Sequence, residues 1–570
     1  MSLHFLCKKP LRATGRCWWA AVLCLAPSWA VAQKPVAELP RVKLDTTYNQ
    51  PQGGKPWKAH TAEELKAALK GSAPGDVIML DAGTSYTGGF EFPAKPNPQG
   101  RWIYIISSAL AKLPEGKRVG PDDAVNMPKL VTPRTMPVFQ VVGGANHWRL
   151  AGLEITANSS YKNAGGKGYT YFLIGSQFNQ SPLPDSFTVD RCYIHGGPEQ
   201  DIVTAVQGNA SNYAVVDSYI SDIHTIGQDS QAIGSFDTPG PFKIVNNYLE
   251  AAGENVMFGG AGKNFNRGVP SDIEVRNNYL FKPLSWAQPG VSIPPGNVMV
   301  VKNAFECKSC QRLLFDSNII ENVWAAGQIG FAIVLTVRSS QSGDFAVVSD
   351  ITITNNILKN VVSGFNTLAK DDQCGAASYA QCKSAGDQSR WYIANNLITF
   401  YDPKQPGGNR NVGLSINGGN DHVNGAKGTL KDIVFQHNTM VALSAPCWNS
   451  MYFSTGGQKP PISNLTSNIW ILDNVLCKQP SGDWGLQGSN GLTQYMGSSS
   501  NEPPLDRRFY GNVIIGGGDK PQNLPPHNLA TTKTPKWADP ARNDYELVDP
   551  TWAQTTDGKP AGIDFSALPK

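Results

Sequence analysis

The sequence predicts an all-β protein built as a single right-handed parallel β-helix. Three observations predict this fold class. A short β-rich phrase recurs ten times, the extra residues of each repeat fall on the same side of the phrase, and a helix-forming segment precedes the first copy. Repetition of one strand-corner-strand unit indicates a solenoid in which each coil packs on its neighbours.

Each copy of the phrase alternates apolar residues and ends in a polar pair followed by two apolar residues. The copies occupy residues 189–194, 215–220, 244–249, 274–280, 314–320, 353–358, 393–398, 435–440, 471–476 and 509–515. Alternation alone also fits a β-sandwich, but a constant register with insertions on one side favours coils of a solenoid. We expect the corner Asn residues, and His437 in place of one, to adopt left-handed geometry and to stack in a ladder.

Both ends of the chain have the composition of caps. Residues 61–64 (Thr-Ala-Glu-Glu) form a capping box that opens a helix of about ten residues, with Leu65, Ala68 and Leu69 on one face. From 518 onward the chain is rich in Pro and Asn and is expected to close the other end with Trp537, Tyr545 and Trp552. The predicted organisation is an extended segment over 33–60, a capped β-helix over 61–517 and a capping tail over 518–570.

The first 32 residues have the three parts of a secretory signal peptide, with cleavage expected after Ala32. We therefore expect a secreted or periplasmic monomer without membrane insertion. Cleavage removes four basic and no acidic residues from a chain with 49 Lys and Arg and 45 Asp and Glu, which leaves 45 of each sign. A neutral protein lacks the basic stripe that nucleic acid requires, so no nucleic-acid partner is expected.

Seven cysteines remain after cleavage, an odd number that leaves at least one unpaired. Cys374 and Cys382 bracket a small loop and are expected to form a disulfide. Cys307 and Cys310 form a lone CxxC, which is weak evidence for a metal. We interpret Cys192 and Cys307 as small buried apolar residues.

The helix cap, the run GDVIMLDAGTSYTG at 75–88 and the series of NNYL-type corners together resemble the pectate-lyase-like superfamily of right-handed parallel β-helices. The resemblance covers nearly the whole mature chain and implies the fold. Because this fold carries lyases, hydrolases and non-catalytic proteins, it does not by itself imply a reaction.

Polar residues inside strands, where alternate side chains face outward, mark the candidate site. Neighbouring coils supply them in the following order: Asp229 and Gln231; Glu254 and Asn255; Lys302, Asn303, Glu306 and Lys308; Thr336 and Arg338. Rows of carboxylate, lysine and arginine complement an acidic polysaccharide. Trp286 and Trp324 flank these coils and are expected either to stack on sugar rings or to pack loops on the barrel.

The phrase Asn303-Ala-Phe-Glu-Cys-Lys-Ser309, with an Arg in the next coil, resembles that of chondroitinase-B-like and alginate-lyase-like β-helix enzymes, although the spacing differs. The resemblance implies calcium bound by Glu306, with Glu254, Asn255 and Asp229 in support. It also implies Lys308 as base and Arg338 as acid, with Lys302 in the catalytic group and Gln231, Asn303 and Thr336 contacting substrate. The alternative is that these charged residues have a purely structural role, as a ladder of salt bridges on an exposed sheet face.

The predicted function is a calcium-assisted polysaccharide lyase acting on a uronic-acid polymer. Two alternatives remain open. A glycoside hydrolase needs two or three carboxylates that converge on the groove, and a non-catalytic carbohydrate-binding solenoid needs no clustered charges. His195 and His224 follow successive corners and form either a base or metal pair or two separate loop histidines.

Overall fold

The computed structural model describes residues 34–570 except for several loops. The residues it does not describe are 1–33, 134–135, 164, 166–167, 176–181, 237, 261–267, 288–298, 339–345, 369–387, 410, 418–429, 443–446, 448, 455–465, 478–504, 517–523, 534 and 549–554. The expected signal peptide, the expected Cys374–Cys382 disulfide and Trp552 lie outside the described residues. No helix in the described part is long and apolar enough to cross a membrane.

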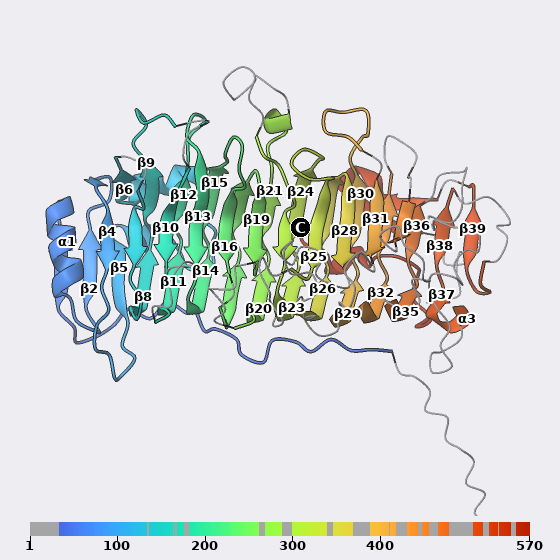
Figure 1. The fold of residues 1–570 in the computed structure, drawn as a ribbon, viewed down its shortest axis with the longest axis horizontal. Coiled ribbons are helices and arrows are strands. Elements are labelled where there is room, and N and C mark those ends of the chain that lie inside the picture. Colours follow the sequence, from blue (N-terminus) through green and yellow to red (C-terminus); the bar gives the residue numbers. More distant parts are fainter. Residues whose placement is uncertain are drawn as a thin grey trace, which may run out of the picture. The chain divides into compact units, whose positions relative to one another are not determined.

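Three long parallel sheets form the body of the protein (Figure 1). Sheet A contains β1 (Pro56–Ala59), β2 (Val77–Leu80), β5 (Ile103–Ser107), β8 (Asn146–Ala151), β11 (Asp185–Asp190), β14 (Ser211–Val216), β17 (Phe242–Val245), β20 (Ser271–Arg276), β23 (Cys310–Asp316), β26 (Val348–Thr354), β29 (Gln388–Ala394), β32 (Leu430–Gln436), β35 (Thr466–Leu472) and β37 (Phe509–Tyr510).

Sheet B contains β3 (Ser85–Thr87), β6 (Lys129–Thr132), β9 (Glu154–Ala157), β12 (Tyr193–His195), β15 (Tyr219–Ile223), β18 (Tyr248–Ala251), β21 (Tyr279–Phe281), β24 (Ile319–Val323), β27 (Ile357–Val361), β30 (Leu397–Phe400), β33 (Thr439–Val441), β36 (Val475–Cys477), β38 (Val513–Ile515) and β39 (Leu529–Thr531). Sheet C contains β4 (Phe90–Phe92), β7 (Phe139–Val141), β10 (Tyr169–Ile174), β13 (Ile202–Gly208), β16 (Gln231–Ser235), β19 (Glu254–Phe258), β22 (Phe305–Cys307), β25 (Phe331–Thr336), β28 (Ser363–Leu368), β31 (Val412–Asn417) and β34 (Asn449–Ser454).

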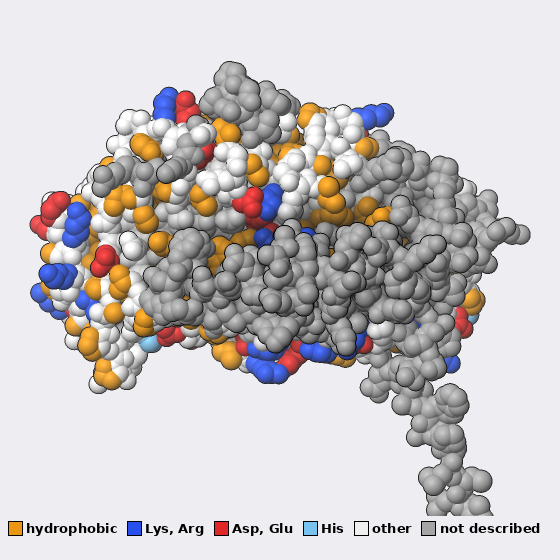
Figure 2. Space-filling model, in the orientation of Figure 1, with side chains coloured by type: hydrophobic (Ala, Val, Ile, Leu, Met, Phe, Trp, Pro, Cys, Tyr) orange, Lys and Arg blue, Asp and Glu red, His pale blue; other side chains and the backbone are white. Residues whose placement is uncertain are grey.

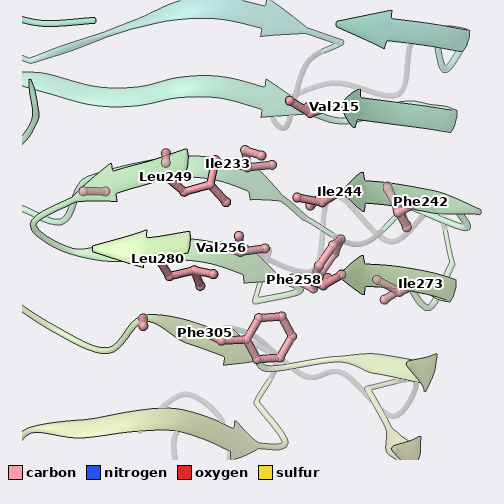
Figure 3. Packing of buried hydrophobic residues seen from close by; sticks show 14 of the residues in the cluster. Val215, Ile233, Phe242, Ile244, Leu249, Val256, Phe258, Ile273, Leu280 and Phe305 are labelled. Carbon is pink, nitrogen blue, oxygen red and sulfur yellow. The ribbon is translucent and has the colours of Figure 1, made fainter. Parts of the chain in front are cut away.

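The chain visits sheets A, B and C in turn, so each circuit is one coil and every strand pairs in parallel with its equivalents in the coils before and after. Apolar side chains from the three sheets meet along the interior, as Figure 3 shows for Val256, Phe258 and Phe305. The predicted parallel β-helix is confirmed. Its fold follows from a period-two pattern whose apolar side faces one continuous core.

The remaining elements are short. They are α1 (Ala62–Gly71), α3 (Leu505–Arg508), the 3-10 helices η1 (Leu110–Lys112), η2 (Pro121–Asn126), η3 (Leu284–Ala287), η6 (Pro540–Arg542) and η8 (Phe565–Ala567), and an antiparallel pair of β40 (Trp537–Asp539) and β41 (Asp544–Leu547). Helix α1 caps the first coil as predicted. The Thr61 side chain accepts from the Glu64 N–H at 3.2 Å, and Leu65 and Leu69 are buried.

A ladder of buried asparagines joins the corners between sheets A and B. The Asn247 amide donates to Asn278 Oδ1 at 3.0 Å, and the same bond repeats at every coil through Asn318, Asn356, Asn396, Asn438, Asn474, Asn512 and Asn528. The left-handed backbone conformation falls on the preceding residue, as at Asn246 and His437. The expectation that one residue does both tasks, with His437 in the ladder, is therefore wrong: Asn438 stacks and His437 turns the chain.

Both ends of the described chain run back along the coils. Residues 34–49 cross the outer side of sheet A, which Figure 1 shows as the blue segment below the strands. Their hydrogen-bonded partners, in chain order, are Gln436 for Lys34, Asp350 for Glu38, Asp272 for Arg41, Lys243 for Leu44 and Arg149 for Thr46. Sheet B continues to β39, past the expected boundary at 517, and the tail then returns along sheet B, where Asp564 bonds to Asn395 at 2.7 Å.

The outer face of sheet B carries a row of tyrosines beside a buried pair of carboxyls. Tyr219 and Tyr248 stack at 4.1 Å, and the Tyr248 hydroxyl donates to Glu250 at 2.8 Å. Burial and the nearby charge of Asp222 raise the pKa of Glu250 to about 7. The folded protein therefore keeps a proton on Glu250 that the unfolded chain loses near pH 4.5.

Glu250→Gln is expected to raise the free energy of unfolding by roughly 1–3 kcal/mol above pH 7 and by little below pH 4.5. Stability of the parent falls as pH rises through this window, because ionising Glu250 in the fold is unfavourable, and glutamine removes that cost. Thermal melts at both ends of the window measure the effect. The matched control is Glu321→Gln, whose carboxylate pairs with Lys359 at 3.0 Å; an equal gain there would contradict the assignment.

Candidate functional site

Strands β16, β19, β22 and β25 lie side by side in sheet C, and most of the residues selected from the sequence lie in these strands or within three residues of their ends. Val256 pairs with Phe305 and both face the core, so the next residue, Glu306, faces outward. Lys308 follows on the same face. Arg338 comes from the next coil, and its backbone N–H donates to the Lys308 carbonyl at 2.9 Å. The fold therefore brings these three charged residues together, and we call them the Lys308 group.

Within the Lys308 group, Glu306 is buried and its carboxylate has no hydrogen-bond partner among the described residues. The ammonium group of Lys308 lies 3.5 Å from Glu306 Oε2 and 3.8 Å from the sulfur of Met257. A buried carboxylate without donors is costly, so its charge is balanced by the neighbouring lysine rather than by hydrogen bonds. The Thr336 hydroxyl, in the adjacent strand, is also buried without a partner in the described structure.

A second set of side chains lies at or just before the start of β16, β19 and β22, and we call it the Lys302 cluster: Asp229, Gln231, Glu254 and Lys302. The Gln231 amide donates to Glu254 Oε2 at 2.8 Å. Lys302 Nζ lies 2.7 Å from Glu254 Oε1 and 2.8 Å from Asp229 Oδ2. Gln231 and Glu254 are in register across β16 and β19, which explains why their side chains meet.

Lys302 is held in its protonated form by its neighbours. Burial acts to lower the pKa of Lys302, but the carboxylates of Glu254 and Glu306 outweigh it, and Asp229 adds a hydrogen bond, so the pKa lies above its usual range. Lys302 is a permanent cation and cannot serve as a base near neutral pH. The effect of Glu306 on Lys302 also shows that the Lys302 cluster and the Lys308 group are neighbours.

Lys282 is a functional-site neighbour that the sequence analysis missed. It is fully buried, and its ammonium group donates to the carbonyls of Ala251, Ala252 and Gly253 at 2.7, 3.1 and 2.6 Å. Burial lowers the pKa of Lys282 to about 7, against the attraction of Glu254. The three bonds fix the turn that leads into β19. The only signal in the sequence is a lysine directly after a corner phrase.

Several predicted residues have surroundings other than those expected. Trp286 and Trp324 are 4% and 2% exposed and pack in one apolar cluster, so packing of loops on the barrel is the arrangement found. The Asn255 amide donates to the carbonyls of Leu249 and Phe281 and thus braces the corner before β19. Asn303 is buried, with Oδ1 unpaired among the described residues.

The two histidines do not form a pair. His195 lies on sheet B, where its Nε2 is 3.0 Å from Glu154 Oε1. His224 is buried against Trp286, and burial lowers its pKa to about 4. The interpretation of two separate histidines is therefore the one observed.

One group in the described residues has ligand atoms close enough for a metal. It consists of His437, Asp473 and Asp557, whose ligand atoms lie within 4.8 Å of one another. Its members also hold the tail against the coils, since His437 Nδ1 lies 3.1 Å from the Gly562 carbonyl and Asp473 accepts from the Thr556 N–H at 2.8 Å.

A disulfide spans the turn that carries Lys308. Cys307 at the end of β22 is bonded to Cys310 at the start of β23, with Cα atoms 6.0 Å apart, and Lys308 and Ser309 form the loop between them. The interpretation of Cys307 as a free apolar residue is therefore wrong, whereas Cys192 is free and buried. A second disulfide joins Cys447 and Cys477.

The two disulfides make a matched test. Loop-closure entropy predicts a loss of about 2 kcal/mol for Cys307→Ala with Cys310→Ala and about 4 kcal/mol for Cys447→Ala with Cys477→Ala. Only the first pair is expected to lower activity, by at least tenfold, because it frees the turn that positions Lys308. Urea unfolding and initial rates on one polymer measure both effects. Equal rates for the two double variants would contradict a positioning role for the first disulfide.

No family model and no curated protein matches the sequence. Among solved structures, the family PL6 alginate lyase AlyGC aligns with a TM-score of 0.52 and 14% identity, over 90% of this chain and 57% of that one. This chain thus spans little more than half of AlyGC.

Two further structures align less well. The catalytic unit of a GH87 α-1,3-glucanase from Streptomyces thermodiastaticus strain HF3-3 aligns with a TM-score of 0.43 and 11% sequence identity, over 79% of this chain and 71% of that one. Pectate lyase Pel9A aligns with a TM-score of 0.31 and 16% sequence identity, over 72% of this chain and 83% of that one. The likeness to AlyGC confirms the pectate-lyase-like β-helix fold.

Proposed function

We propose that this protein is a polysaccharide lyase that cleaves a uronic-acid polymer by β-elimination. The observation that carries the proposal is the Lys308 group, in which Lys308 and Arg338 lie on two adjacent coils joined by a backbone hydrogen bond and the ammonium group of Lys308 lies beside Glu306. An amine and a guanidinium on neighbouring coils are the groups that this reaction needs. The fold shared with AlyGC agrees with the proposal without establishing it.

The chemistry assigns a task to each residue. Lys308 first releases its ammonium proton to solvent and then, as the free amine, removes the proton from the sugar carbon next to the carboxylate. The electron pair forms the new carbon-carbon double bond, and the glycosidic oxygen on the neighbouring carbon leaves. Arg338 donates a hydrogen bond to that oxygen as its charge develops, and the oxygen takes up a proton from water to complete the alcohol. No oxidant or second substrate is needed.

The substrate class follows from the local charge. The described surface mixes basic and acidic side chains, and Figure 2 shows small groups of both signs on one face. With the mature chain neutral overall, recognition of an anionic polymer depends on the site itself, where Lys302, Lys308 and Arg338 gather. A uronate carboxylate beside these cations loses part of its charge, which makes the adjacent proton easier to remove.

The residues expected to bind calcium do not fit it well. Glu254 and Asp229 are both paired with the ammonium group of Lys302, and Gln231 occupies the second oxygen of Glu254. Asn255 and Asn303 offer unpaired oxygens, but the remaining carboxylate, Glu306, lies 3.5 Å from the ammonium group of Lys308 and also interacts electrostatically with Lys302. A dication there would be close to like charges, so no step of the mechanism is assigned to calcium.

A hydrolase is less well supported by the same geometry. It requires two carboxyl groups that face each other across the scissile bond, whereas Glu254 and Asp229 neutralise Lys302 and Glu306 adjoins Lys308. A carbohydrate-binding protein without enzymatic activity would not need these clustered charged residues. The test below distinguishes that function from a lyase.

Export from the cytoplasm is part of the proposal. Two disulfides are formed among the described residues, and such bonds persist in oxidising compartments. They agree with the signal peptide expected from the sequence.

The test is to incubate the purified chain with alginate, pectate, glycosaminoglycans and bacterial exopolysaccharides, and to follow the ultraviolet absorbance of the unsaturated sugar end. A lyase produces this absorbance together with new chain ends on at least one uronate polymer. New reducing ends without the absorbance would identify a hydrolase. Binding without either product would identify a carbohydrate-binding solenoid.

A further inference from the structure

We propose that Lys302 is a resident cation that takes the place of a metal ion, so that the site works without calcium. This inference rests on the proposed lyase function. It starts from one contact set: a single ammonium group, 8% exposed as a residue, lies 2.7 Å from one carboxylate and 2.8 Å from another. Carboxylate oxygens around one small cation are the ligands that calcium prefers. Here the cation is covalently part of the chain.

The partners of Lys302 are held in place from both sides. Glu254 is fully buried and is fixed through Gln231, whose own oxygen accepts from the Thr204 hydroxyl at 3.1 Å. The turn before Glu254 is held by the three bonds of Lys282. A buried carboxylate with this support requires a positive partner, and Lys302 supplies it with good geometry.

Charge balance argues against a metal ion in addition to Lys302. Asp229, Glu254 and Glu306 supply three negative charges, and Lys302 and Lys308 supply two positive charges within contact distance of them. Lys282 is a third amine close to Glu254. A divalent ion would have to displace the ammonium group of Lys302 before it gained Asp229 or Glu254 as a ligand.

Removal of the ammonium group should therefore create a metal site. In Lys302→Met, the carboxylates of Asp229 and Glu254, which both contact the ammonium group in the parent, lose the cation that they share. Such a donor set is suited to calcium. Lys302→Arg keeps the charge and is the matched control, and Lys359→Met, from a partly exposed pair on sheet B, controls for the loss of a lysine.

The experiment is calcium titration by calorimetry and thermal melting, with activity measured after chelation. The parent protein is expected to show no calcium binding in the micromolar range and to keep its rate within twofold in chelator. Lys302→Met is expected to bind calcium and to melt at a higher temperature in its presence, whereas Lys302→Arg and Lys359→Met show no such response.

Two results would overturn the proposal: stoichiometric calcium binding by the parent with loss of activity in chelator, or a folded Lys302→Met variant that does not respond to calcium. If Lys302→Met fails to fold, the titration and chelation of the parent still decide. Absence of any lyase product from the parent would remove the proposed function, while the calcium titrations would still settle the role of Lys302.

Discussion

Lys308→Ala is expected to lower the turnover number by about 10²–10⁴-fold on the polymer that the parent cleaves, because it removes the only base assigned to the reaction. The affinity for polymer is expected to change little, since Lys302 and Arg338 remain to attract the carboxylates. The measurement is the initial rate of unsaturated product formation over a range of polymer concentrations. It separates a loss of turnover from a loss of binding.

Lys359→Ala is the matched control for this experiment, because Lys359 is an exposed lysine that pairs with Glu321 on another sheet. It should leave both kinetic constants within twofold of the parent. A Lys308→Ala variant that retains more than a tenth of the parent turnover would exclude this lysine as the base. Far-ultraviolet spectra and melting temperatures must match the parent for either result to count.

Lys282→Met is expected to cost the fold about 3 kcal/mol or more, the largest single-residue effect on stability that the structure indicates. Methionine fills a similar volume but removes the ammonium donor from three carbonyls at one turn, of which Ala252 still accepts from the Lys302 N–H at 3.0 Å. An unpaired buried polar group costs about 1–3 kcal/mol. The measurement is urea unfolding below pH 7, where the ammonium form dominates.

The surface variant Lys359→Met sets the scale for this test, with an expected change below about 0.5 kcal/mol. A buried ammonium group also has a desolvation cost, and replacing it by an apolar side chain can be neutral. If Lys282→Met is as stable as the parent, the three hydrogen bonds of Lys282 contribute no more free energy than the desolvation of its ammonium group costs. The role assigned to Lys282 in holding β19 would then be wrong.

The repeat pattern was enough to predict the coils, because the alternation of apolar residues and the polar corner are local properties of each phrase. The helical cap was equally readable, since Thr61 and Glu64 carry their own geometry. The sequence could not predict which corner residue adopts the left-handed conformation and which one stacks in the ladder. Asn246 and Asn247 are the same residue type, and only the structure shows that Asn246 turns the chain and Asn247 stacks.

The candidate site was predictable where strand alternation decided it. Glu306 and Lys308 face outward together because they are two residues apart. Contacts made by loops could not be predicted from the sequence. Nothing in the spacing of Cys307 and Cys310 distinguishes a disulfide across a turn from two buried thiols, and the packing of Trp286 and Trp324 depends on how insertions fold back on the barrel.

The segment formed by residues 34–49 changes how the coils depend on one another. In a solenoid whose repeats touch only their neighbours, fraying at one end leaves the other end intact. Here Lys34 is bonded to Gln436 and Thr46 to Arg149, so one short stretch of chain ties together coils nearly 290 residues apart. These bonds couple distant coils into one cooperative unit, which leaves few partly opened states for a protease to attack.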